Sequence, residues 1–225
     1  MSKTYFVTGT DTEVGKTAVS CAILEAAAAA GLSTAAVKPV AAGCDEQGQN
    51  EDALQLMASM TAEMGYAQVN PVALAPAIAP HIAAAQAGRN LKASQLAGFC
   101  RGVMMSPADL VLIEGAGGWR VPISSRETLA DLARELQAGV ILVVGMRLGC
   151  INHAVLTAEA VIRDGLPLAG WVANQPGERM GCHEENLDTL RNLLPAPLLG
   201  EIPEISPWDP KKASSFIDIS RLTGK

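Results

Sequence analysis

Short apolar runs alternate with longer amphipathic stretches along most of this chain. The runs are short enough to be buried strands, and the stretches between them carry apolar residues at the spacing of a helix face. The predicted strands cover residues 5–7, 34–37, 109–113, 140–144, 168–173 and 197–202. The predicted helices cover residues 18–30, 51–60, 94–105, 129–136, 151–162 and 182–194. Because strands and helices alternate, we predict an α/β fold with a mostly parallel sheet and helices on both faces.

Two regions show no such pattern. Residues 69–79 contain prolines and are predicted to be irregular, and Pro80 is expected to open a helical piece that runs to residue 87. The polar tail after Pro207 receives no assignment. No stretch of linker composition divides the chain, so residues 1–225 are predicted to form a single domain.

The composition narrows the choice of partners and of compartment. A net charge of −6 with scattered basic residues argues against nucleic acid or an anionic membrane as the main partner. Five cysteines without a C-x-x-C pair favour a reducing cytosol over a disulfide framework or a structural zinc site. There is no signal segment and no apolar run that could span a membrane, so we expect a cytoplasmic protein. The three histidines lack a metal-ligand spacing, and His183 is expected to be a solvated helix residue.

The first predicted strand leads into a glycine-bounded loop that ends in Gly15-Lys16-Thr17 and is followed by a helix. This order of elements is typical of a P-loop, in which backbone N–H groups and the helix N-terminus bind phosphate. Lys16 would reach the outer phosphates, and the Thr17 hydroxyl would bind Mg²⁺. Five residues separate Gly9 from Gly15, where the usual motif has four. The alternative is an ordinary glycine-rich turn with a surface lysine, but the intact order of elements favours the P-loop.

Ligands of a parallel α/β sheet bind beyond the carboxyl ends of its strands, and two charged residues are predicted there. Glu114 follows the strand 109–113 and precedes a Gly-Ala-Gly-Gly run, where an acid could bind Mg²⁺. The alternative is a solvated acid before a flexible turn. Lys38 ends the strand 34–37, and a lysine there suits an acceptor that is already anionic and needs no general base. A lysine lying along the sheet edge explains this residue equally well.

Two predicted helix N-termini are further candidates for ligand binding. Asp52 could hold Mg²⁺ or a substrate amine, although the helix dipole alone explains an acid in a first turn. Residues 149–152 open a helix whose free N–H groups could bind a carboxylate. A plain helix cap is the favoured interpretation of this segment by itself.

Several segments together resemble the dethiobiotin synthetase family over residues 5 to about 205. They are YFVTGTDTEVGKT at 5–17, VKPVAAG at 37–43, APH at 79–81, LIEGAGGW at 112–119, LGCINHA at 148–154, GWVAN at 170–174 and APLLGEIP at 196–203. The five-residue P-loop spacing is that family's own. The resemblance implies an ATP- and Mg²⁺-dependent cyclo-ligase of P-loop NTPase type, which uses CO₂ to close a cyclic urea on 7,8-diaminononanoate. One amine would become a carbamate and receive the γ-phosphate, and the second amine would then displace phosphate.

The resemblance also implies roles for individual residues. ATP and its metal would be held by Glu13, Val14, Gly15, Lys16, Thr17, Ala18, Asp52, Glu114, Gly115, Ala116 and Gly117, with Thr17, Asp52 and Glu114 as the Mg²⁺ ligands. Adenine would contact Asn174, Gln175, Pro203, Glu204 and Ile205. The substrate would contact Thr12, Lys38, Ala42, Pro80 and Gly118, and in a homodimer also Gly149, Cys150, Ile151 and Asn152 of the other subunit. Lys38 would stabilise the carbamate and the γ-phosphate. Lys38 and Lys16 are therefore the two residues to which the resemblance gives a catalytic role.

Two positions depart from the family pattern, because Ala42 and Ala79 stand where a serine is common. Both positions lie at the expected diamine pocket. The protein could therefore bind the diamine more weakly, or it could act on a related substrate. Two other functions also stay open, namely a nucleotide-switch ATPase of the partitioning or metal-delivery kind and a small-molecule kinase. Such switch ATPases commonly carry an additional lysine early in the loop, and residues 10–13 contain none.

Overall fold

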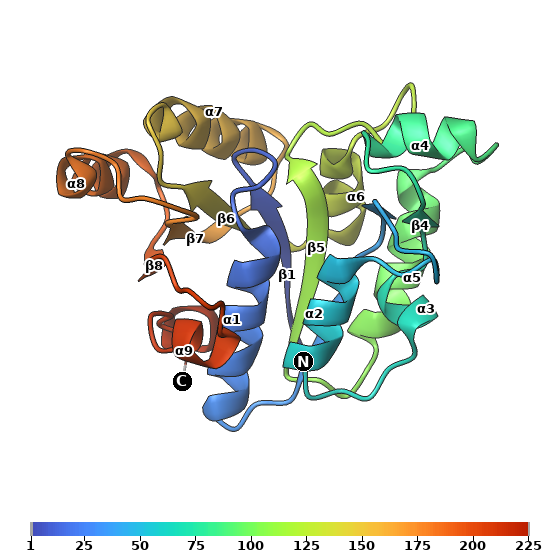
Figure 1. Ribbon diagram of the computed structural model, residues 1–225, viewed down its shortest axis with the longest axis horizontal. Helices are drawn as coiled ribbons and strands as arrows, with labels where there is room; N and C mark the ends of the chain where they lie inside the picture. The colour runs from blue at the N-terminus through green and yellow to red at the C-terminus, as the bar shows by residue number, and fades with distance from the viewer. Residues whose placement is uncertain (1, 225) are drawn as a thin grey trace.

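Six apolar strands pair into one parallel sheet in the computed structural model, which describes residues 2–224 (Figure 1). The strands are β1 (Lys3–Gly9), β2 (Thr34–Val37), β5 (Leu110–Gly118), β6 (Gly139–Gly145), β7 (Leu168–Asn174) and β8 (Leu198–Ile202), in the spatial order β2-β5-β1-β6-β7-β8. Every neighbouring pair in this sheet is parallel. The carboxyl ends of all six strands therefore share one edge, and the loop after β1 lies between the ends of β5 and β6.

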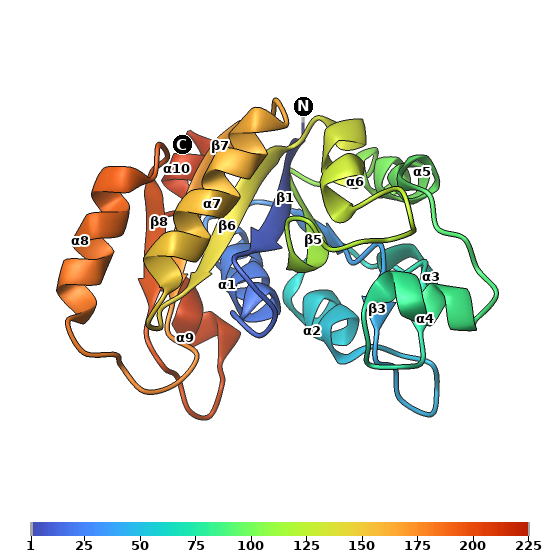
Figure 2. The same ribbon diagram turned by 90° about the horizontal axis from the view of Figure 1, so that it is seen from above.

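Helices cover both faces of the sheet, as Figure 2 shows. The helices are α1 (Lys16–Ala29), α2 (Glu51–Ser59), α3 (Tyr66–Val69), α4 (Pro80–Gln86), α5 (Ala93–Met104), α6 (Leu129–Leu136), α7 (Cys150–Arg163), α8 (His183–Leu193), α9 (Pro210–Ser214) and α10 (Ser220–Thr223). Side chains of α1, α2, α9 and α10 share a core on one face, and those of α5, α6, α7 and α8 pack on the other. Successive residues of β5 enter opposite cores, so the central strands are apolar throughout.

The structure confirms the predicted α/β fold and adds a small second sheet. This sheet pairs β3 (Ala41–Ala42) with β4 (Ala73–Leu74) in parallel. Its strands and the one-turn helix α3 lie in or beside regions that the sequence predicts as irregular. Elements this short leave no periodic pattern, so the sequence could not reveal them.

Strand β5 is longer than predicted. The sequence predicts an end at residue 113, but pairing with β1 continues through Val7–Glu114 and resumes at Gly9–Gly118 after a register shift. Glu114 therefore lies inside the sheet and is fully buried. The solvated strand-end acid considered from the sequence is ruled out by this burial.

The tail after Pro207 is folded against the start of the chain. Ala213, Ile217 and Leu222 are buried in the core that also contains α1. The Tyr5 hydroxyl donates to the Leu222 carbonyl at 2.6 Å. The sequence left this tail unassigned because its helices are only one turn long and mostly polar. Within residues 2–224, no helix has the length and apolar character needed to cross a membrane.

Candidate functional site: a nucleotide cleft at the carboxyl edge

The loop between β1 and α1 is shaped by the close packing of Val14. Added Cβ atoms at Gly9 and Gly145 would lie 2.7 Å and 2.9 Å from side-chain carbons of Val14, so two strand-end glycines make room for this side chain. The Asn174 side-chain amide donates to the Val14 carbonyl at 2.9 Å, which ties the loop to the end of β7. Gly15 has a left-handed φ of 82° and is the N-cap of α1, so the helix begins at Lys16. The first N–H groups of α1 therefore face the loop, as phosphate binding requires.

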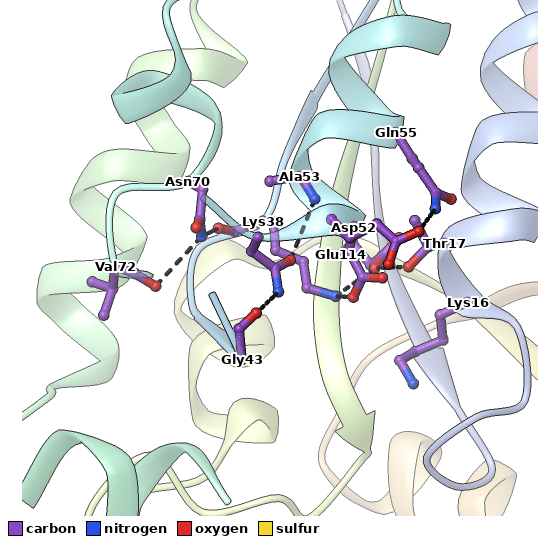
Figure 3. Close-up of polar contacts among 12 residues, drawn as sticks. Lys16, Thr17, Lys38, Gly43, Asp52, Ala53, Gln55, Asn70, Val72 and Glu114 are labelled. Carbon is purple, nitrogen blue, oxygen red and sulfur yellow. Dashed lines mark hydrogen bonds and ion pairs between the residues drawn. The ribbon is translucent and has the colours of Figure 1, made fainter. Parts of the chain in front are cut away.

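Lys16 is buried and makes one weak polar contact. Its ammonium donates to the Asp11 carbonyl at 3.3 Å, and Figure 3 shows it directed away from the nearby carboxylates. Burial, and after it repulsion from Lys38, lowers the pKa of Lys16 to about 8. A buried ammonium with a poor partner gains strongly when an anionic phosphate arrives.

The lowered pKa of Lys16 predicts that nucleotide affinity depends on pH. Phosphate favours the charged amine and so raises its pKa in the complex, which means that binding takes up a proton above about pH 8. We expect MgATP affinity to be level below that pH and to fall above it, by up to about tenfold per pH unit. Calorimetric titrations in buffers of different ionisation heat measure the proton uptake. Lys16→Arg stays charged and should lose this dependence; equal uptake in the variant would assign it to another group.

Lys38 lies at the centre of a charge cluster in which Lys38 and Glu114 are buried and Asp52 is partly exposed (Figure 3). Its Nζ atom lies 2.6 Å from Asp52 Oδ2 and 2.6 Å from Glu114 Oε1. The Thr17 hydroxyl donates to the same Glu114 oxygen at 2.8 Å. Three elements, α1, α2 and β5, thus deliver side chains to the lysine at the end of β2. The sequence named all four residues separately, and the structure brings them together.

The charges of this cluster stabilise one another. Burial alone would lower the pKa of Lys38, but the charges of Glu114 and Asp52 outweigh it and raise that pKa. Burial would raise the pKa of Asp52, but Lys38 outweighs it and lowers that pKa. Lys38 is therefore a charged ammonium and cannot act as a general base at neutral pH. It offers a fixed positive charge instead.

The oxygen atoms of this cluster fit a magnesium ion. Oε2 of Glu114 is buried and has no hydrogen-bond partner among residues 2–224, although its other oxygen has two. An unpartnered buried carboxylate oxygen is costly unless a cation occupies it. Thr17, Asp52 and Glu114 offer the oxygen ligands that Mg²⁺ prefers.

A cleft of about 670 Å³ opens beside this cluster. Its lining includes many of the predicted residues, namely Thr12, Glu13, Gly15, Lys16, Thr17, Lys38, Ala42, Asp52, Pro80, Ala116 and Gly117. It also includes residues that the sequence did not single out as contacts: Ala41, Asn50, Ala77, Ile78 and Val121. The wall formed by residues 77–80 and Ala42 is apolar, as suits an aliphatic substrate chain.

Two asparagines missed by the sequence analysis support the cleft. Asn50 caps α2 by accepting from the Ala53 N–H at 3.4 Å, and it donates to the Gly43 carbonyl at 2.8 Å. Asn70 donates to the Lys38 carbonyl at 2.7 Å and so fixes the lysine backbone. An asparagine before an amphipathic helix is a helix-start signal that could have identified the first. The second lies next to short elements that the sequence could not reveal.

The other predicted residues lie outside the lining of this cleft. Val14 lies in the loop and Ala18 in α1, and Glu114, Gly115 and Gly118 belong to β5. Asn174, Gln175, Pro203, Glu204 and Ile205 lie at or just beyond the ends of β7 and β8. Gly149, Cys150, Ile151 and Asn152 form the N-terminal end of α7.

The prediction for His183 is wrong. Its side chain is buried, and its Nε2 atom lies 2.7 Å from Glu201 Oε1. Glu184 brings a third possible ligand close to this pair, although it also forms an ion pair with Arg179. Because His183 is the first residue of α8, the fold turns it back against β8, which the helical pattern alone does not indicate.

The parallel sheet, the glycine loop before α1 and the adjacent Thr-Asp-Glu-Lys cluster define a P-loop NTPase. Solved structures agree on the fold: the MinC:MinD cell division protein complex of Aquifex aeolicus matches with a TM-score of 0.61 at 14% identity, over 100% of this chain and 96% of that one. MinD of Pyrococcus horikoshii, complexed with Mg-ADP, matches with a TM-score of 0.56 at 16% identity, over 100% and 90%.

Sequence comparison defines the family within this class. A family described as an AAA domain matches residues 3–212. The ATP-dependent dethiobiotin synthetase BioD of Marinobacter nauticus is 54% identical, covering 97% of each chain. The synthetase BioD 1 of Escherichia coli O157:H7 is 50% identical, covering 99% of this chain and 100% of its own. This chain therefore belongs to the ATP-dependent dethiobiotin synthetases, which confirms the predicted family and its ATP-dependent ligase activity.

Proposed function

We propose that this protein converts 7,8-diaminononanoate, CO₂ and ATP into dethiobiotin, ADP and phosphate, as a step of biotin biosynthesis. The observation that carries the proposal is the lysine-centred cluster beside the P-loop cleft. Lys38 ends β2, and both acids next to it are engaged by its charge. A site that offers a cation and no free carboxylate base suits an acceptor that is already an anion, such as a carbamate.

The chain's own residues account for most of the chemistry by positioning and charge. Lys16 and the N–H groups at the start of α1 would hold the β- and γ-phosphates. Lys38 would lie between the carbamate oxygen and the γ-phosphate and stabilise the charge that passes between them. The γ-phosphoryl group would pass to the carbamate oxygen as its bond to ADP breaks. The second amine would then attack the carbamate carbon, forming the C–N bond of the ring as the C–O bond to phosphate breaks, and the departing phosphate would take the amine proton.

Three residues would hold the magnesium ion, namely Thr17, Asp52 and Glu114. Bound there, Mg²⁺ would neutralise charge on the phosphate oxygens. The unpartnered Oε2 atom of Glu114 and the short contacts around its Oε1 atom support this assignment.

The adenine would lie at the ends of β7 and β8, against Asn174, Gln175 and residues 203–205. Support comes from the Asn174 amide, which already touches the phosphate loop, and from Gln175, whose Oε1 atom is buried without a partner among the described residues. That oxygen could accept a hydrogen bond from an exocyclic amine.

We further propose a homodimer in which residues 149–152 of one subunit bind the substrate carboxylate at the site of the other. These residues open the 14-residue helix α7 and do not line their own cleft. The adjoining Leu148 is 95% exposed and Leu156 on α7 is 56% exposed, as unpaired interface residues would be. Mixing Lys38→Ala subunits with subunits carrying Gly149→Val and Asn152→Ala should restore turnover, because one site of each mixed dimer is intact. Failure of mixed dimers to regain activity would contradict the shared site.

Phosphate release from MgATP and bicarbonate, with and without 7,8-diaminononanoate, tests the main proposal. Strong dependence on the diamine, with a cyclic urea identified by mass, is expected. An ATP hydrolysis rate that does not depend on the diamine would contradict the substrate assignment. A stable phosphorylated product would identify a kinase instead.

The substitution Ala42→Ser, which supplies the hydroxyl that this chain lacks, is predicted to tighten binding of the diamine. Ala42 lines the cleft next to Pro80, where a serine could donate one neutral hydrogen bond. Such a bond contributes about 1 kcal/mol, so Ala42→Ser should lower the KM for the diamine about fivefold. The KM for ATP should stay unchanged, which serves as the internal control. A higher KM for the diamine would show that this wall has been adapted to another substrate.

We place the reaction in the cytosol. All five cysteines are free, as expected where thiols stay reduced.

A further inference from the structure

Lys38 supplies the positive charge that lies between the proposed magnesium ligands. Its Nζ atom lies 2.6 Å from an oxygen of each acid, Asp52 Oδ2 and Glu114 Oε1. The Thr17 hydroxyl contacts the same Glu114 oxygen at 2.8 Å. All three proposed ligands of the metal thus converge on the region that the ammonium holds.

Burial explains why a cation must stay at this position. Glu114 is fully buried, and within the described part of the chain its one ion-pair partner is Lys38. Lys16 does not replace it, because its ammonium contacts the Asp11 carbonyl. A carboxylate this deep in the sheet, without a partner, would be strongly destabilising.

The ammonium and a magnesium ion would compete for the same two acids, because Lys38 already holds one oxygen of each. Thr17, Asp52 and Glu114 would hold a magnesium ion through oxygens at about 2.0–2.1 Å, which would bring its charge close to the lysine Nζ atom. The two cations would also repel each other strongly in a buried site. Oε2 of Glu114 has no partner among the described residues and is open to the metal, so the repulsion between the two charges is what favours release of Lys38 when the metal binds.

We propose that Lys38 is the resident counter-cation of the metal-free magnesium site, and that metal loading releases its side chain into the cleft. The proposal rests on the magnesium ligands proposed above and adds a second state for Lys38. The lysine backbone is held by Asn70 and by the Val69 carbonyl, at 2.7 Å each, so the change is confined to the side chain. Lys38 already lines the cleft, so a change of side-chain rotamer would leave its ammonium inside the cleft. The charge that the acceptor needs would thus become available only once the metal has been loaded.

Metal titration of the nucleotide-free protein tests this exchange. Mn²⁺, whose free form is counted by electron paramagnetic resonance, serves as the probe for wild type, Lys38→Met and Lys38→Arg. We expect Lys38→Met to bind Mn²⁺ at least about tenfold more tightly than wild type, because the competing cation is gone. Lys38→Arg keeps a cation near the carboxylates and should bind as weakly as wild type. Equal or weaker binding by Lys38→Met would overturn the proposal.

Crystal structures of the wild-type protein give an independent test, which does not depend on whether Lys38→Met folds. Lys38 should contact both carboxylates without metal and neither carboxylate after a Mg²⁺ soak. A lysine that keeps both contacts beside a bound magnesium ion would overturn the exchange. Failure of the proposed reaction is recognised separately, in the diamine-dependent phosphate release, because neither of these tests involves the diamine.

Discussion

Lys38→Ala is expected to lower turnover by about 10²–10³-fold while ATP binding stays within a few-fold of wild type. Lys38 is the cation that faces the acceptor, whereas the phosphates are held mainly by Lys16 and the start of α1. Initial rates of phosphate release and calorimetric titration with ATP separate the two effects. Lys211→Ala, on an exposed part of α9, controls for the loss of one positive charge elsewhere. Normal turnover in Lys38→Ala would refute the role given to this residue.

The same variant should also lose stability in the absence of metal. Removing one partner of a buried ion pair typically costs about 3–5 kcal/mol, because the remaining charge is left without compensation. Glu114 is that remaining charge. Thermal unfolding with and without Mg²⁺ measures the effect, and added Mg²⁺ should stabilise Lys38→Ala more than wild type. Equal stabilisation would argue that the ion does not bind at Glu114.

Much of the site could be predicted because its parts follow separate strands. The apolar runs located the six main strands, and a parallel sheet places their carboxyl ends along one edge. The strand pattern therefore identifies Lys38, Glu114 and the glycine loop as neighbours. It does not identify their mutual contacts, since the helix dipole by itself is enough to explain Asp52 in a first turn. The 2.6 Å contact with Lys38 assigns Asp52 to the cluster.

The features that escaped prediction depend on tertiary contacts. Glu114 is buried because β1 continues to pair beyond residue 113, and a Gly-Ala-Gly-Gly run does not resemble a strand by itself. His183 is buried because α8 packs its first turn against β8. The residues of α9 and α10 are polar, yet Ala213 and Leu222 complete the core beside α1. In each case packing overrides a local pattern that points to solvent.

Gly15→Ala is expected to weaken ATP binding by about 100-fold or more and to lower turnover with it. Gly15 has a φ of +82°, and a Cβ added there would lie 2.2 Å from the Asn174 side-chain nitrogen. Asn174 is buried, so its amide cannot move aside without losing the hydrogen bond to the Val14 carbonyl. The loop that presents N–H groups to phosphate would then change shape.

Gly31→Ala is the matched control for Gly15→Ala. Gly31 has a similar φ of +79°, but an added Cβ there meets nothing within 4 Å. It should cost about 1–2 kcal/mol of stability through backbone strain alone and leave ATP binding unchanged. Equal loss of ATP binding in both variants would assign the effect to strain.

A double-mutant cycle with Asn174→Ala isolates the clash between Gly15 and Asn174. Asn174→Ala removes the amide that the new Cβ would meet, so Gly15→Ala should weaken ATP binding much less in that background than in wild type. Asn174→Ala by itself should weaken ATP binding because it frees the Val14 carbonyl, and the comparison is therefore made within each background. Additive losses across the cycle would show that the two residues act independently, and that Gly15 is required for another reason than the space Asn174 occupies.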